Sequence, residues 1–190
     1  MPSFKDRSRK LSALVALLTL SYPFLVLVGA RYLSSTTLVA AICVLVAGRL
    51  CLGGRSPFDL VLAAAVACQI LLLTFEPSIA VRTYPLMVNL GLAGVFAYTL
   101  WSAPPMIERF ARVSSPILSA DAVPYLRNLT AAWVCFFMLN AAAAAWTVAY
   151  GTLEQWALYN GFIAYLLMGT MLAGEWLVRR WVLGKRGSRV

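Results

Sequence analysis

Long apolar stretches separated by short polar connections run through almost the whole chain. The stretch from Trp156 to Arg180 shows the pattern most clearly, because Glu175 is its only charge before the closing pair of arginines. An α-helix rises about 1.5 Å per residue, so about 20 residues cross a hydrocarbon core of roughly 30 Å. This stretch therefore predicts a transmembrane helix, with aromatic residues at both headgroup levels and arginines at one of them.

Turn residues and charges divide the rest of the chain into similar segments. Gly53 and Gly54 end one segment, and Pro57 followed by Asp59 is typical of the first turn of the next helix. The connection 76–82 is expected to be a loop. We therefore expect an all-α fold, a polytopic membrane helix bundle that forms one domain over residues 1–190, with six transmembrane helices at about 11–30, 37–52, 57–75, 84–101, 129–150 and 156–178.

The first segment, 11–30, follows a short basic leader, so a cleaved signal peptide is an alternative interpretation. The apolar run of a cleaved signal is usually about 7–15 residues long, and this run is longer. We therefore expect the segment to be retained as the first helix.

The longest connection, 102–128, contains a short amphipathic segment. Its apolar residues fall on one helical face and its charged residues on the other, the two sets being Met106, Ile107, Phe110 and Val113, and Glu108, Arg109 and Arg112. This pattern predicts an interfacial helix at about 105–113 that lies flat on the cytoplasmic leaflet with its apolar face in the headgroup boundary.

Charge placement predicts the topology. The chain has 16 Lys and Arg against 7 Asp and Glu, a formal net charge of +9, but the cations lie at the ends of apolar segments. This placement does not favour nucleic-acid binding. We expect the apolar segments to contact membrane lipid. In the six-helix arrangement only Arg31 and Arg82 fall on the side opposite the other cations. The positive-inside rule then predicts a multi-pass protein with both termini in the cytoplasm.

Composition excludes several kinds of chemistry. The chain contains no histidine, which removes histidine-based triads, histidine metal sites and imidazole proton relays. The four cysteines, Cys43, Cys51, Cys68 and Cys135, lack metal-site or redox spacing and are expected to be small packing residues. We therefore assign no catalytic residue, metal ligand or cofactor.

Four amide side chains fall within membrane depth in the expected helices: Gln69, Asn89, Asn140 and Asn160. Amides in a bilayer should face protein rather than lipid. They could form hydrogen bonds between helices, typically about 0.6–2 kcal/mol each, or they could line a substrate site. The first interpretation is favoured.

Charged and polar residues near the expected cytoplasmic face are candidates for contact with a partner or a lipid headgroup: Glu108, Arg109, Arg112, Asp121, Tyr125, Arg127, Glu175 and Arg179. A solvated face and an interfacial ion pair are the simpler interpretations. Glu175 and Arg179 are four residues apart on one helix, a spacing that favours an ion pair. We predict that Glu175 also bridges to Arg109, Arg112 or Arg127, because all are expected at the same end of the bundle.

A weak internal similarity links residues 21–29, SYPFLVLVG, with residues 83–91, TYPLMVNLG. The two segments belong to expected helices of opposite orientation, and inverted repeats are typical of transporters. One short match between apolar segments also arises easily by chance, so it remains a hypothesis.

Several segments resemble a family of uncharacterised bacterial inner-membrane proteins encoded beside genes for aryl polyene and other fatty-acid-type biosynthesis. The resemblance covers most of the chain and rests on TYPLMVNL, PPMIERFARV, Tyr125-x-Arg-Asn, WVCFFMLN and WALYNGFIAYLLMGTMLAGEWLVRR. It implies location in the inner membrane, and acyl carrier proteins or neighbouring biosynthetic enzymes as partners. It implies no catalytic residue and no oligomeric state.

Three functions remain open at this point. The first is an accessory subunit that docks soluble acyl-chain enzymes, or their products, at the inner membrane for lipid biosynthesis or export. It fits the cationic face, because acyl carrier proteins are acidic. The second is a transporter of lipids or small molecules, which has few ionisable groups at mid-membrane to couple ion movement. The third is a membrane acyl- or glycosyl-transfer enzyme.

Overall fold

The computed structural model describes residues 22–29, 32–52, 57–114 and 122–187, and within these ranges the regular structure is all helical. The helices are α2 (Tyr22–Gly29), α3 (Ser35–Leu52), α4 (Pro57–Leu73), α5 (Pro77–Arg82), α6 (Tyr84–Trp101), α7 (Met106–Ser114), α8 (Ala122–Ala149), α9 (Leu153–Leu158), the π-helical turn η1 (Tyr159–Ile163) and α10 (Ala164–Gly187). Most of the expected helix 11–30 lies outside the described residues, which include only its last part as α2.

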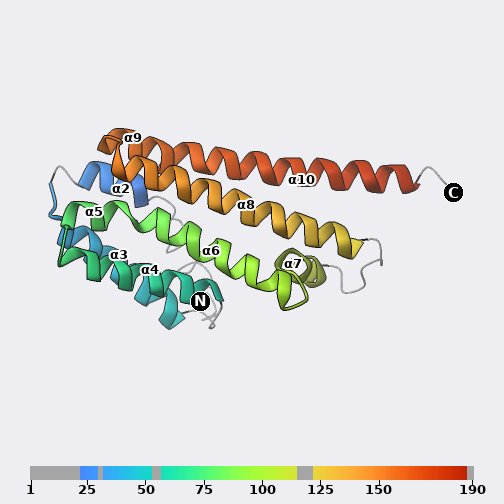
Figure 1. The fold of residues 1–190 in the computed structure, drawn as a ribbon, viewed down its shortest axis with the longest axis horizontal. Coiled ribbons are helices and arrows are strands. Elements are labelled where there is room, and N and C mark those ends of the chain that lie inside the picture. The colour runs from blue at the N-terminus through green and yellow to red at the C-terminus, as the bar shows by residue number, and fades with distance from the viewer. Residues whose placement is uncertain (1–21, 30–31, 53–56, 115–121, 188–190) are drawn as a thin grey trace, which may run out of the picture.

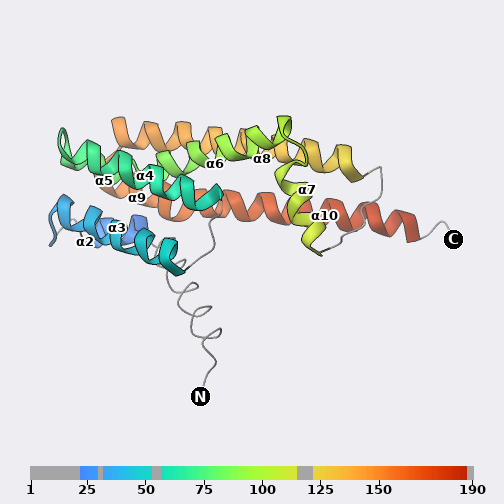
Figure 2. The same cartoon turned by 90° about the horizontal axis from the view of Figure 1, so that it is seen from below.

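The long helices run along one common direction, and α7 crosses them near one end of the bundle (Figures 1 and 2). Helix α6 packs against α8 and also against α4, while α4 packs against α3. Most of the long helices are apolar around their whole circumference, as expected where lipid replaces water on the outside. Helix α7 is strongly amphipathic, unlike the long helices that the structure describes.

Three continuous helical segments among the described residues are long and apolar enough to cross a membrane: Tyr84–Trp101, Ala122–Ala149 and Leu153–Val178. The apolar helices Ser35–Gly48 and Pro57–Leu73 are shorter than these. Many large apolar side chains on the long helices are exposed, such as Leu139 and Leu166. A helical membrane protein accounts for this surface, and the six-span arrangement remains a prediction.

Element boundaries confirm part of the expected pattern. The expected helix 84–101 coincides with α6, and α3 and α4 begin and end within two residues of expectation. Helix α8 begins at Ala122, ahead of the expected transmembrane span 129–150, and carries Pro124 in its first turn, where a missing backbone N–H costs little. The expected loop 76–82 is also wrong, because Pro77 starts the short helix α5 there.

The last helix begins earlier and ends later than expected. Thr152 and Gln155 form a capping box that starts α9 at Leu153, so the helix does not wait for Trp156. It continues without a break through η1 and α10 to Gly187, beyond the expected end at 178.

Two clusters of buried side chains form the core. One joins α2, α3 and α4 with Tyr84 and Trp156. The other is aromatic and joins α6, α7 and α8, with Phe96 and Phe137 in edge-to-face contact at 5.2 Å between ring centroids. Within the alanine run of α8, Ala141 and Ala144 are buried, as small residues at a helix contact should be.

Gly91 of α6 permits the closest approach of α4. A methyl group in place of its hydrogen would lie 2.4 Å from the Cγ1 atom of Val61, which is far inside van der Waals contact. At this point the α4–α6 contact therefore requires glycine.

Candidate functional site

At one end of the bundle, Arg82 joins α5 to the C-terminal turn of α8. Its Nη2 atom donates hydrogen bonds to the carbonyl oxygens of Thr147 and of Gly151, the latter at 2.7 Å. The indole N–H of the fully buried Trp156 donates to the Arg82 carbonyl at 2.9 Å. The last carbonyls of a helix lack partners within the helix, and a cation there is also favoured by the helix dipole. Arg82 thus supplies both the hydrogen bonds and the charge that this helix end requires.

Burial lowers the pKa of the Arg82 guanidinium below its ordinary value. An arginine nevertheless stays charged at neutral pH. Its Nε atom is buried and has no hydrogen-bond partner among the described residues. The charge is therefore held mainly by the carbonyl groups of Thr147 in α8 and of Gly151 just after it.

The same end of the bundle contains two of the four predicted amides. Gln69 is fully buried on α4 and donates to the Ala80 carbonyl of α5 at 2.9 Å. Asn160 donates to the Trp156 carbonyl at 2.9 Å and to the Thr147 hydroxyl of α8 at 3.3 Å. Both amides connect different helices, as the interhelical interpretation predicts.

The other two amides differ in their partners. Asn140 of α8 accepts a hydrogen bond from the Tyr159 hydroxyl at 2.8 Å, so it also connects two helices. Asn89 donates to the Pro85 carbonyl of its own helix at 2.8 Å and makes no bond between helices. Proline at position 85 lies in the first turn of α6, and Asn89 is the residue one turn later.

The π-helical turn η1 contains both Tyr159 and Asn160, the two residues that reach α8. A π-helical turn inserts an extra residue into the helix and rotates the side chains that follow, and such turns are frequent at functional sites. Here it allows two neighbouring polar side chains to face the same helix.

At the opposite end, two threonines cap α7. The Thr99 hydroxyl of α6 accepts the Met106 N–H at 2.9 Å, and the Thr130 hydroxyl of α8 accepts the Ile107 N–H at 3.3 Å. Each hydroxyl donates to a carbonyl of its own helix, so it acts as donor and acceptor at once. Both threonines are almost completely buried. Helix α7 is therefore fixed to the bundle through its first N–H groups, which a helix cannot satisfy by itself.

This arrangement differs from the expected exposure of the first turn of α7. Met106, Ile107 and Glu108 are all buried, whereas Val113 is exposed. Glu108 accepts both Nε and Nη2 of Arg112, at 2.9 Å and 2.5 Å. The expected exposure of Met106 to lipid and of Glu108 to water is wrong, because the capping threonines draw the first turn into the bundle. Phe110 and Val113 are exposed, and the position of α7 flat on the leaflet stays a prediction.

The other charged and polar residues predicted near the cytoplasmic face do not form one cluster. Arg109 donates to the carbonyls of Pro104 and Ser102, Tyr125 packs against the aromatic cluster, and Arg127 is exposed. Glu175 is half-buried. Asp121 and the side chain of Arg179 lie outside the described part, so the Glu175 bridge stays a prediction.

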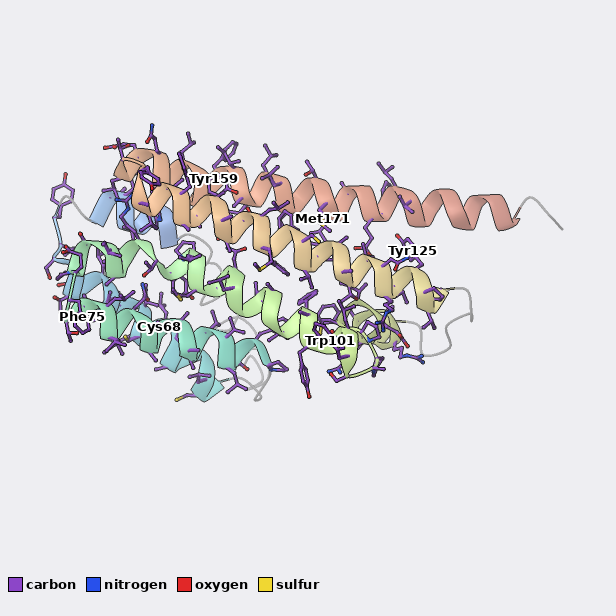
Figure 3. The ribbon with its side chains drawn as sticks, viewed as in Figure 1. Cys68, Phe75, Trp101, Tyr125, Tyr159 and Met171 are labelled. Carbon is purple, nitrogen blue, oxygen red and sulfur yellow. The ribbon has the colours of Figure 1, made fainter. Side chains whose placement is uncertain are left out.

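A groove of about 380 Å³ lies between α8 and the η1–α10 segment. Its walls are mostly apolar, and Asn140, Tyr159 and Thr170 are its polar residues. Figure 3 shows Tyr159 and Met171, two of the residues that line it, at different positions along the last helix. Sequence reasoning identified Asn140 but not Tyr159, and no sequence signal marks the groove.

A second, wholly apolar groove of about 320 Å³ lies between α4 and α6. The four thiols are free, and Cys51, Cys68 and Cys135 are exposed on the outside of the helices. The expectation that these three are packing residues is therefore wrong. No group of three or more His, Cys, Asp and Glu side chains comes together among the described residues.

No protein-family model, curated protein or solved structure matches the chain. The site must therefore be interpreted from its own geometry: an arginine junction at one end, a capped amphipathic helix at the other, and a groove with one polar pair between α8 and α10.

Proposed function

We propose that the protein is an accessory subunit of the bacterial inner membrane that docks an acidic soluble partner at its cationic end. In this proposal the chain crosses the membrane six times and both termini are cytoplasmic. The end that carries α7 and the C-terminus of α10 faces the cytoplasm.

The observation that carries the proposal is the length of α10. The helix continues nine residues past Val178, the end of its apolar span, to Gly187. At about 1.5 Å per residue this adds roughly 14 Å. In both views α10 extends past α7 and past the first residues of α8 (Figures 1 and 2). The sequence places only basic charges on this extension: Arg179, Arg180, Lys185 and Arg186.

Two further arginines at the same end support the proposal. Arg127 in the first turns of α8 is exposed, and the Arg112 side chain is 46% exposed although Glu108 holds it. Because the two threonine caps fix α7, these cations are presented from a rigid surface. A rigid surface with an excess of one charge sign favours rapid and selective association with an opposite charge.

The resemblance noted in the sequence suggests an acyl carrier protein as the partner, because carrier proteins are acidic and serve fatty-acid-type biosynthesis. Docking at the membrane would bring the carried acyl chain to the lipid surface. Transport and group transfer remain alternatives without a specific observation that favours them over docking.

The test measures binding of a purified acyl carrier protein to the full chain in nanodiscs. One variant replaces Arg180, Lys185 and Arg186 by Gln, and the matched control replaces Lys5, Arg7 and Arg9 by Gln. We expect the tail variant to bind about tenfold more weakly, as for three exposed charge contacts of about 0.2–1 kcal/mol each, and the control to bind like the wild type. Binding should also weaken with salt.

Equal binding by the two variants would contradict the docking proposal. If the tail variant instead loses only its preference for nanodiscs rich in anionic lipid, the extension binds the membrane surface rather than a protein partner.

A further inference from the structure

The groove between α8 and α10 has the dimensions of a single hydrocarbon chain. Its lining residues on the last helix run from Tyr159 to Met171, which is about 18 Å of helix. A volume of about 380 Å³ spread over that length gives a cross-sectional area of about 20 Å², which matches that of one extended hydrocarbon chain. The volume also falls within the range of roughly 300–1,000 Å³ that is usual for ligand pockets.

The Asn140 amide in the groove uses one of its two polar atoms in a hydrogen bond and leaves the other available. The Asn140 side chain is 4% exposed, and its Oδ1 atom accepts the Tyr159 hydroxyl at 2.8 Å. Its Nδ2 atom makes no hydrogen bond to any described residue. If the amide were turned over, the Oδ1 atom would be the unpartnered one, so one amide atom is free in either orientation. An unpaired amide in apolar surroundings costs free energy that a ligand atom can recover.

The depth of Asn140 specifies where that ligand atom must lie. Trp146 and Tyr150 are exposed and in contact, with their ring planes tilted and their centroids 4.6 Å apart, and such aromatic residues mark the membrane interface. Asn140 lies six residues before Trp146, which is about 9 Å further along α8. The complementary atom is therefore inside the hydrocarbon layer and not in the headgroup.

We propose that this groove binds the hydrocarbon chain of a membrane lipid that carries an oxygen acceptor along the chain, a carbonyl or a hydroxyl. The acceptor takes a hydrogen bond from the Asn140 Nδ2 atom, and the Tyr159 hydroxyl fixes the amide in the orientation that permits this bond. The π-helical turn η1 places Tyr159 at this position. The apolar wall residues Phe136, Leu139 and Leu167 contact the chain on both sides of the oxygen.

The experiment uses the full chain in nanodiscs of phosphatidylethanolamine and phosphatidylglycerol, with a stearate that carries a terminal diazirine as the photoreactive probe. Unlabelled stearate and a stearate with a mid-chain keto group compete for labelling. We expect labelling to map to α8 and α10. The keto chain should compete about two- to tenfold more strongly than stearate, as for one hydrogen bond.

Matched variants separate the polar contact from the groove itself. Asn140→Leu should remove the preference for the keto chain, and Asn89→Leu, whose amide bonds its own helix, should retain it. Leu167→Trp should fill the groove and reduce labelling severalfold. Leu166→Trp is the control, because Leu166 is exposed and does not line the groove. Thermal unfolding of every variant identifies those that fail to fold, and the competition ratio in the wild type needs no variant.

Equal competition by the two chains in the wild type overturns the proposal, because it leaves no role for the amide. Labelling that maps elsewhere overturns it as well. If Leu167→Trp leaves labelling unchanged but alters the oligomeric state measured by light scattering, the groove packs a second copy of the chain, and the proposal is overturned.

Discussion

The hydroxyl of Thr130 on α8 accepts a hydrogen bond from the backbone N–H of Ile107 on α7, 23 residues earlier in the chain. Thr130 is fully buried, so no water can replace this acceptor if it is lost. Helix α7 therefore depends on a side chain of another helix for its attachment.

Replacing Thr130 by Val keeps the shape of the side chain but removes the acceptor. We expect a loss of about 1–2 kcal/mol in the free energy of unfolding, typical of a lost cap, and faster proteolysis within 102–121. Thermal unfolding and limited proteolysis in detergent provide the measurements. Thr170→Val is the control, because the Thr170 hydroxyl is exposed and bonds only its own helix. Similar behaviour of both variants would refute the role of the cap.

Arg82→Gln should destabilise the protein by about 1.5–3 kcal/mol, because hydrogen bonds from a charged group to the Thr147 and Gly151 carbonyls are lost. Arg82→Lys should recover part of the loss, since it keeps the charge at the helix end but not the guanidinium geometry. Unfolding followed by Trp fluorescence is a suitable measurement, since Trp156 lies at the junction. The control is Arg127→Gln at an exposed arginine, and an equal loss there would mean that Arg82 has no special role.

Gly91→Ala should destabilise the α4–α6 contact by about 1–3 kcal/mol, because the added methyl group would overlap Val61. Val61 is β-branched and cannot easily rotate away within a helix. Adding Val61→Ala in the same chain should recover stability. Gly94→Ala should be neutral or slightly stabilising, since that position faces open space. Failure of the double variant to recover would show that the overlap is relieved in another way.

Topology can be measured with reporter fusions. Reporters after Lys10, at Ser56, at Ser115 and after Arg189 should report cytoplasm, and reporters at Ser34 and Pro77 should report the opposite side. One clear reversal is enough to reject the six-span arrangement.

Glu175→Gln tests the predicted bridge from α10 to the segment 102–128. If Glu175 bridges to an arginine of that segment, the variant should be cleaved faster there at matched folded fraction. Arg109 and Arg112 already have hydrogen-bond partners of their own, so we expect Arg127 to be the arginine that pairs with Glu175. Unchanged cleavage would leave Glu175 with a purely local role.

The sequence predicted those features that depend on residues close together in the chain. Helix α6 agrees with expectation at both ends, because Pro85 marks its first turn and turn residues follow its last residue. Asn140 and Asn160 were found because amides in an apolar run must face protein. The short helix α5 was missed because a six-residue segment that follows Glu76 and ends at Arg82 resembles a loop.

Long-range partners account for the rest. Arg82 bonds main-chain carbonyls 65 and 69 residues away, and a carbonyl has no sequence signature. Thr99 and Thr130 resemble ordinary helical threonines, and only the packing of α7 turns them into caps. For the same reason the periodicity of α7 did not predict that Met106 and Glu108 are both buried, because amphipathicity specifies two faces but not which neighbour covers them.

Helix α10 loses most of its packing after Met171, and the residues from Leu172 to Val178 are exposed except Glu175. From Leu172 to Gly187 the helix is an arm of about 24 Å. The end of α10 near Gly187 is therefore connected to the two buried clusters through the earlier part of the same helix, where Met168 and Met171 pack against the aromatic cluster. Substitutions on the last turns of α10 should accordingly leave the stability of the bundle unchanged.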